Sequence, residues 1–219
     1  MVSLVYWKFK INLMKKVFTI LSIFLASQSI GQQIFVDGQS ATRKFIGIEP
    51  QFNFFRDWST QAEFKSGIGE YVHFFPVELK NLRTGEKLNA LQLEMMVKTA
   101  DPSASIGGFG MRKKDETTSF AYIGLDEVNE FISFLEKNVV PNLGLSLNNK
   151  SSEFIFKAKE MVFYYTVVEK EKRISISIPV IDENTQASTG KFLYFWTEKN
   201  VEDIPSLVKV LKIAVAKKK

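Results

Sequence analysis

Few residues in this 219-residue chain have the types and spacing that catalysis requires. His73 is the only histidine, so a two-histidine metal site cannot form, and a Ser-His-Asp triad would have to use it. No Gly-x-Ser-x-Gly sequence occurs in the chain. His73 lies in an alternating apolar series with Tyr71, Phe75 and Val77, which is typical of a partly buried histidine with a satisfied hydrogen bond. We therefore expect no catalytic residue, no metal and no cofactor.

Glycine-rich and acidic segments match functional motifs only in part. The loop at 106–110 lacks the spacing of a dinucleotide-binding fingerprint, and no Gly-Lys-Ser/Thr sequence follows it. Acidic pairs at 115–116, 126–127, 182–183 and 202–203 fall in expected turns or first helical turns, where solvation and the helix dipole explain them. Carboxylate catalysis would need two acids that converge at about 5–10 Å across a cleft. A carboxylate-dependent hydrolase acting on envelope or extracellular glycans is therefore the alternative, and the balance leans against an enzyme.

The absence of cysteine excludes several classes of site together. The chain can form no disulfide, no thiolate metal centre and no cysteine nucleophile. It also cannot carry a lipid on a cysteine at an export junction. We expect no lipid anchor.

Aromatic side chains are the one unusual feature, because the chain contains 20 phenylalanines. Most of them must belong to the hydrophobic core. The cluster between Gln51 and Trp58, and one tyrosine in a predicted hairpin, are the candidates for a ligand groove or a partner surface. The candidate ligand-binding residues are Phe52, Phe54, Phe55, Trp58 and Tyr164.

The basic isoelectric point, about 9.2, comes mainly from the two ends of the chain. Residues 1–31 contain four lysines and no acid, which leaves 25 basic and 24 acidic residues in the remainder. Three of those bases are the terminal Lys217, Lys218 and Lys219. A phosphate-binding surface needs clustered basic side chains, so we exclude nucleic acid as a partner.

The N-terminal 31 residues have the order of a secretory signal peptide. Met14, Lys15 and Lys16 form a basic start, residues 17–26 are apolar, and small residues Ser29 and Gly31 precede Gln32. The apolar run is too short to span a membrane as a helix. We expect Met14 to be the true start, cleavage before Gln32, no membrane span after cleavage, and an exported protein that is periplasmic or secreted.

Hydrophobic periodicity predicts the elements of residues 32–219, which we expect to form one domain. Alternation at 71–79 and 91–97 around a turn at 81–87 predicts a hairpin with one apolar face, and a strand follows at 118–123. Short strands are expected at 34–36 and 45–48. A helix at 127–139, with Asp126 as its N-cap and Pro141 after its end, has a helical apolar stripe.

The C-terminal half repeats this order. A second hairpin at 161–178 is expected with Val168 opposite Arg173, one face formed by Phe163, Tyr165 and the alternate isoleucines of 174–178, and Tyr164 on a wet face. A strand at 191–197 and a helix at 202–215 complete it. The predicted fold is α+β: a largely antiparallel sheet of about six to nine strands packed by two α-helices, arranged as two β-rich halves that each end in a helix.

These observations favour a non-enzymatic binding or interaction module of the bacterial envelope, whose partner is a small ligand or an envelope protein of unknown identity. A purely structural envelope component is a third possibility. An enzyme should show two acids converging in a pocket with perturbed pKa values, whereas a binding module should show an aromatic-lined surface without them.

The export signal gives a first testable prediction. We expect N-terminal sequencing of the exported protein to begin at or near Gln32. A mature protein that still begins at Met1 or Met14 would contradict it.

Overall fold

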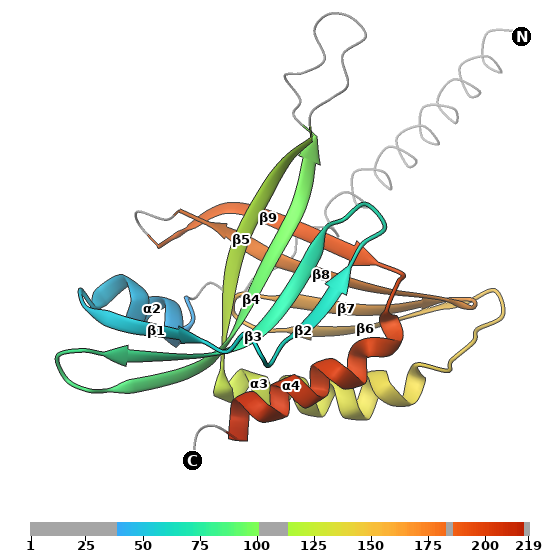
Figure 1. Cartoon of the computed structure of the whole chain (residues 1–219). Coiled ribbons are helices and arrows are strands. Elements are labelled where there is room, and N and C mark those ends of the chain that lie inside the picture. The colour runs from blue at the N-terminus through green and yellow to red at the C-terminus, as the bar shows by residue number, and fades with distance from the viewer. Residues whose placement is uncertain (1–38, 101–113, 183–185, 217–219) are drawn as a thin grey trace, which may run out of the picture. The chain divides into compact units, whose positions relative to one another are not determined.

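The computed structural model describes residues 39–100, 114–182 and 186–216 (Figure 1). Within these ranges the chain has nine strands in two antiparallel sheets, together with helices, which is the α+β class predicted from the sequence. The signal peptide and the strand expected at 34–36 lie outside the described residues. None of the described helices is long and apolar enough to cross a membrane.

The five-stranded sheet, sheet A, has the order β1 (Phe52–Arg56), β3 (Tyr71–Asn81), β4 (Lys87–Ala100) and β5 (Lys114–Gly124). The short β2 (Ala62–Lys65) shares the edge of β3 with β1: β1 pairs with residues 77–81 and β2 with residues 71–74. Pro76 lies at the break between the two paired segments, where proline has no N–H to offer a neighbouring strand. The chain therefore leaves the sheet after β1, and Trp58 lies in the resulting loop.

The predicted hairpin at 71–99 is confirmed, but the prediction of one apolar face is wrong. Leu93 pairs with Phe74, whereas His73 pairs with Glu94 and Phe75 with Gln92. The two alternating series therefore lie on opposite faces of sheet A. The face with Phe74 and Leu93 belongs to the main core, and the opposite, outer face carries His73 and Phe75.

The four-stranded sheet, sheet B, has the order β6 (Ser151–Lys157), β7 (Val162–Val168), β8 (Glu171–Ile181) and β9 (Ser188–Thr197). The predicted second hairpin is confirmed, with Val168 opposite Glu171 rather than Arg173. The connection is shorter than expected because Glu169 adopts a positive φ of 55°, which allows a two-residue turn. A shift of two residues leaves every side chain on its predicted face, and Phe163, Tyr165 and Val167 are fully buried.

Both predicted helices are present. α3 (Leu125–Phe134) continues as a π turn (Leu135–Val139) and a short 3₁₀ turn (Val140–Asn142), and α4 (Ile204–Ala216) follows a 3₁₀ turn (Val201–Asp203). Asp126 is not the N-cap of α3: that position is Gly124, and Asp126 lies in the first turn of the helix. The apolar stripe of each helix is largely buried, as periodicity predicted.

The strand expected at 45–48 is wrong, because these residues end the helix α2 (Ala41–Ile48). Ser40 caps this helix, with its Oγ accepting a hydrogen bond from the Arg43 N–H at 3.1 Å. Phe45 packs edge to face on Phe52 of β1, with ring centroids 6.0 Å apart. α2 and β1 together thus cover a small apolar cluster on the outer face of sheet A, formed by Phe75, Val77, Leu79 and Ala90.

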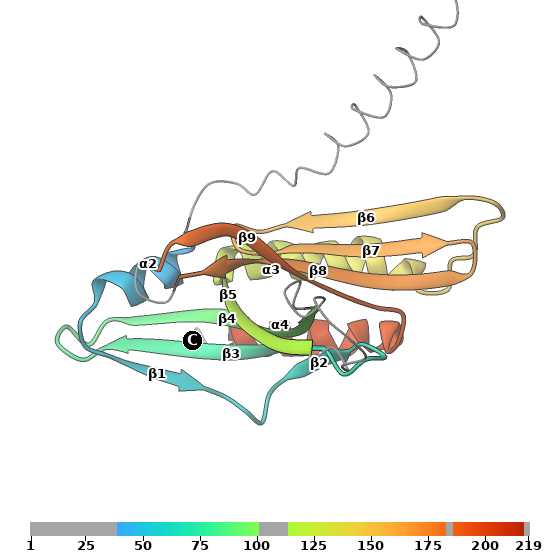
Figure 2. The same ribbon diagram turned by 90° about the horizontal axis from the view of Figure 1, so that it is seen from above.

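The main core lies between the two sheets, and α3 and α4 run side by side along one side of the two layers and contribute to it (Figures 1 and 2). Phe131 of α3 stacks on Phe156 at 4.8 Å and meets Phe163 edge to face at 5.2 Å. Where β5 lies against β8, the Ser119 hydroxyl donates to the Pro179 carbonyl at 3.3 Å. Because this core fills the space between the layers, the outer faces of sheets A and B point away from each other.

Two isoleucines on sheet B test this arrangement. Ile176 is 1% exposed on the core face, and Ile155 is 43% exposed on the outer face. We expect Ile176→Ala to lower the free energy of unfolding by about 2–5 kcal/mol, and the matched Ile155→Ala to lower it by about 0.5 kcal/mol. Urea unfolding of both variants measures the difference, and equal losses would contradict the assignment of the two faces.

Candidate functional site

The five predicted ligand-binding residues do not form one site. Phe52 and Phe54 are half-buried on β1 against the small apolar cluster, and Phe55 points from the opposite face of the strand with 59% of its surface exposed. Tyr164 lies on β7 of sheet B and is half-buried. Trp58, 63% exposed, packs on a fully buried ring of sheet A, so the candidate site is centred on it.

Trp58 packs on the outer face of sheet A, where Phe75 and Arg56 contact its ring. Its ring meets Phe75 edge to face at 5.0 Å, and Phe75 itself is fully buried. The Arg56 guanidinium lies 4.7 Å from the centroid of the Trp58 ring and 5.1 Å from that of Phe75. The contact with Arg56 adds a cation–π attraction to the ring packing, so the indole is exposed and yet fixed in place.

Arg56 is fixed in turn by a carboxylate. Its Nη1 donates to Glu94 Oε2 at 3.0 Å, and both side chains are only 16% exposed. Phe54 and Phe120 lie 5.9 and 5.8 Å from the same guanidinium. The charge of Arg56 is thus neutralised by one acid and surrounded by aromatic rings.

A second set of polar contacts continues from Glu94 across the sheet. Tyr71 Oη donates to Glu94 Oε1 at 3.3 Å, and the Tyr71 ring stacks on His73 at 4.4 Å. His73 Nε2 lies 2.5 Å from Glu63 Oε1, and Lys65 Nζ lies 2.9 Å from Glu63 Oε2. His73 is therefore partly buried and paired, as the sequence predicted. We name Arg56, Trp58, Glu63, Tyr71, His73 and Glu94 the sheet A cluster.

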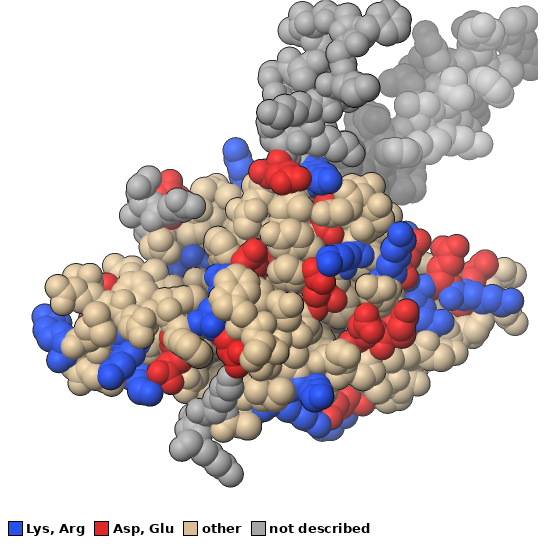
Figure 3. Space-filling model, viewed as in Figure 1, with Lys and Arg blue, Asp and Glu red and all other residues tan. Residues whose placement is uncertain are grey.

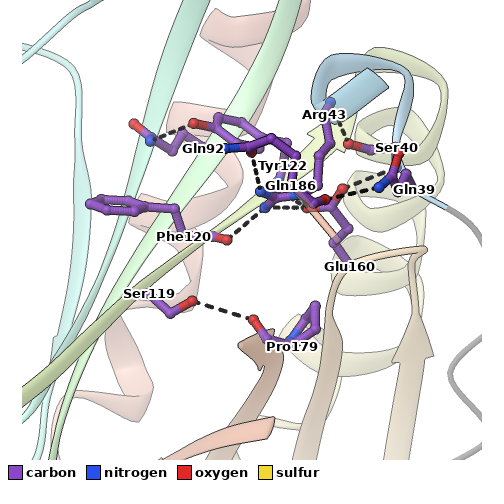
Figure 4. Close-up of polar contacts among 10 residues, drawn as sticks. All are labelled: Gln39, Ser40, Arg43, Gln92, Ser119, Phe120, Tyr122, Glu160, Pro179 and Gln186. Atoms are coloured by element: carbon purple, nitrogen blue, oxygen red, sulfur yellow. Dashed lines mark hydrogen bonds and ion pairs between the residues drawn. The ribbon is translucent and has the colours of Figure 1, made fainter. Parts of the chain in front are cut away.

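A buried polar network fixes the strand beside the sheet A cluster (Figure 4). Glu160 accepts hydrogen bonds from Arg43 Nε and Nη2 at 3.0 and 2.8 Å, from the Ser40 N–H at 3.0 Å and from the Tyr122 N–H at 3.0 Å. Arg43 Nη2 also donates to the Phe120 carbonyl at 2.8 Å. These bonds fix the outer edge of β5 at Phe120 and Tyr122, and the Phe120 ring faces Arg56.

Tyr122 and Gln92 extend this network to β4, the strand that carries Glu94. Arg43 lies over the Tyr122 ring at 5.1 Å, and Tyr122 Oη accepts from Gln92 Nε2 at 3.2 Å. Burial raises the pKa of Tyr122, which keeps the phenol protonated at neutral pH. Gln92 Oε1 is buried without a hydrogen-bond partner, so the amide is only half satisfied.

The cluster contains two carboxylates of the kind that the hydrolase alternative requires. Glu63 on β2 and Glu94 on β4 are the two cross-strand neighbours of His73 on β3. Because adjacent strands lie about 4.8 Å apart, the two glutamate Cα atoms are about 10 Å apart. Each carboxylate is held by a cation, Glu63 by Lys65 and Glu94 by Arg56, and Glu63 also contacts the His73 ring. Burial alone would raise the pKa of Glu63, but the hydrogen bonds and charges of His73 and Lys65 outweigh it and lower that pKa. A general acid needs the opposite shift.

Metal chemistry finds no support in the described part of the chain. No group of three or more His, Asp or Glu side chains there gathers closely enough to hold an ion. The chain matches no known family model, no curated protein and no solved structure.

Sequence reasoning missed Arg56, Glu63, Tyr71 and Glu94. The signal that could have found Glu94 is the alternation at 91–97, which places Gln92 and Glu94 together opposite the leucines. The contacts of Arg56 and Glu63 depend on how β1 and β2 divide the edge of β3, which the local pattern does not contain.

The lowered pKa of Glu63 predicts how the stability of the protein changes at acidic pH. A carboxylate with a depressed folded-state pKa stabilises the fold above its unfolded pKa of about 4.3, and this contribution is lost as pH falls through the folded value. We expect wild type to be more stable than Glu63→Gln at pH 7 and the difference to shrink below about pH 4.3. Urea unfolding between pH 7 and pH 3 measures it, and a difference independent of pH would contradict the pairing.

Proposed function

We propose that this protein is exported and acts as a non-enzymatic binding module of the bacterial envelope, periplasmic or secreted. The surface that we assign to binding is the outer face of sheet A around Trp58. The observation that carries the proposal is that Trp58 is both exposed and held in place. The indole is 63% exposed, and contacts with Phe75 and Arg56 hold it in one position.

A fixed aromatic side chain on a surface favours binding for two reasons. Tryptophan, tyrosine and arginine carry much of the free energy at binding surfaces because each offers a large contact area together with a polar group. A side chain that is already immobilised loses little conformational entropy when a partner covers it. The sheet A cluster places all three residue types next to one another.

The hydrolase alternative draws on Glu63 and Glu94, which flank His73 on the same face. Their pairing with lysine, histidine and arginine argues for fixed binding groups rather than for an acid and a nucleophile. The direction of the Glu63 pKa points the same way. The two functions make different demands on Trp58 and on the carboxylates, and one assay can separate them.

Retention on the cell envelope tests the proposal. We expect the purified exported protein to co-sediment with envelope fragments of the cells that make it, and Trp58→Ala to lose at least tenfold in affinity. Trp196→Ala is the matched control, because Trp196 is 53% exposed on sheet B and carries Arg173 at 4.8 Å. Equal retention of wild type and Trp58→Ala, at equal thermal stability, would contradict the assignment.

The same samples test the hydrolase alternative. A binding module should release no new reducing ends from the envelope fragments over hours, whether Glu63 and Glu94 are intact or changed to glutamine. Steady release by wild type that Glu94→Gln abolishes would establish the enzyme instead.

A further inference from the structure

The charged side chains that the structure describes on the outer face of sheet A are matched in number. Among residues 52–98 and 116–124, the outward positions of the strands carry three bases and three acids: Arg56, Lys65, Lys98, Glu63, Glu94 and Glu116. Arg56 pairs with Glu94 and Lys65 with Glu63, and Lys98 lies directly opposite Glu116 in the register. In the view of Figure 3, basic and acidic side chains are interspersed rather than gathered by sign. Such a face generates no net field to attract an anionic or a cationic ligand.

Exposed apolar surface on this face is small. Trp58 is its one large and strongly exposed apolar side chain among the described residues of the strands and of the loop after β1. A stable protein–protein interface buries about 800 Å² per partner around an apolar centre, which one indole ringed by paired charges does not supply. The surface is better suited to a ligand with one apolar face and many polar groups.

Hydrogen-bond donors and acceptors lie side by side on the face that carries the indole. Arg56 donates through Nη1 to Glu94, which occupies one of the five N–H groups of a guanidinium. Lys65 and Glu63, 59% and 30% exposed, continue the row towards solvent beside His73. Hydroxyl groups are the natural partners for such a row, because each hydroxyl both donates and accepts.

We propose that the outer face of sheet A binds an uncharged glycan, with the C–H face of one sugar ring packed on Trp58 and its hydroxyls bonded to the Arg56–Glu94 and Lys65–Glu63 pairs. Pyranose rings have this amphipathic character: one face presents C–H groups, and the edge presents hydroxyls. The fixed orientation of the indole and of the paired charges means that the site is formed before the sugar arrives. This inference rests on the binding function proposed above and adds the class of ligand.

Removal of the Glu94 carboxylate should change the affinity for neutral and for sulfated oligosaccharides in opposite directions. Glu94→Gln leaves Arg56 without its carboxylate and gives the face a net positive charge. A glycan site should then lose affinity for a neutral oligosaccharide while its affinity for a sulfated one rises. A site that merely tolerates sugars through Trp58 would show neither change.

Protease treatment of the envelope distinguishes a glycan from a protein ligand. We expect envelope fragments stripped of protein to retain the exported protein as well as untreated fragments do. Loss of retention after protease treatment, with Trp58 still required, would overturn the glycan inference and leave the binding function intact. Loss of the Trp58 requirement itself would overturn the binding surface.

An oligosaccharide array then tests the ligand class directly. We expect wild type to bind at least one uncharged set among cello-, malto-, chito- and xylo-oligosaccharides, Trp58→Ala to bind it at least tenfold more weakly, and Trp196→Ala to bind it within twofold of wild type. No binding to any uncharged oligosaccharide, or binding only to sulfated or cationic ones, would overturn the inference.

Discussion

The buried ion pair between Arg43 and Glu160 is the interaction on which the described fold depends. The two side chains are 4% and 3% exposed, and such a pair is tolerated only when hydrogen bonds replace the lost water. Glu160 meets this condition through bonds to the start of α2 and to the Tyr122 N–H at the edge of β5, while it is itself in the connection between β6 and β7. One carboxylate thus joins α2, sheet A and sheet B. Removal of either partner would leave a buried charge uncompensated.

The position of the sheet A cluster follows from a second constraint, the break at Pro76. Because Pro76 offers no N–H to the edge of β3, β1 ends there and β2 begins later, and the intervening loop places Trp58 above Phe75. Glu160 fixes β5 on one side of sheet A, and the loop fixes Trp58 on the other. Arg56 and Glu94 lie between them, in contact with rings from both sides. The rigidity of the cluster is therefore a consequence of the fold around it.

Periodicity in the sequence predicted the elements whose apolar faces are long and regular. The two hairpins and the helices at 127–139 and 202–215 are confirmed because burial of one stripe or face decides their conformation. α2 was taken for a strand because Phe45, Ile46 and Ile48 favour one locally, whereas its conformation depends on Arg43 and a carboxylate 117 residues away. The sheet A cluster was missed for the same reason, because it depends on contacts between residues distant in sequence. Its strand residues come from β1, β2, β3 and β4, and only the strand register brings them together.

The central claim is the proposal that ligands bind the outer face of sheet A, and the two tryptophans of residues 32–219 report on it separately. Trp7 belongs to the predicted signal region, which leaves Trp58 on sheet A and Trp196 on sheet B, each with one indole N–H. Proton–nitrogen NMR spectra of the ¹⁵N-labelled mature protein, recorded during titration with soluble fragments of the envelope glycan, resolve these two signals. The account predicts a saturable shift of the Trp58 signal with the Trp196 signal unmoved. A shift of the Trp196 signal alone, or no shift of either signal at saturating fragment concentrations, would contradict it.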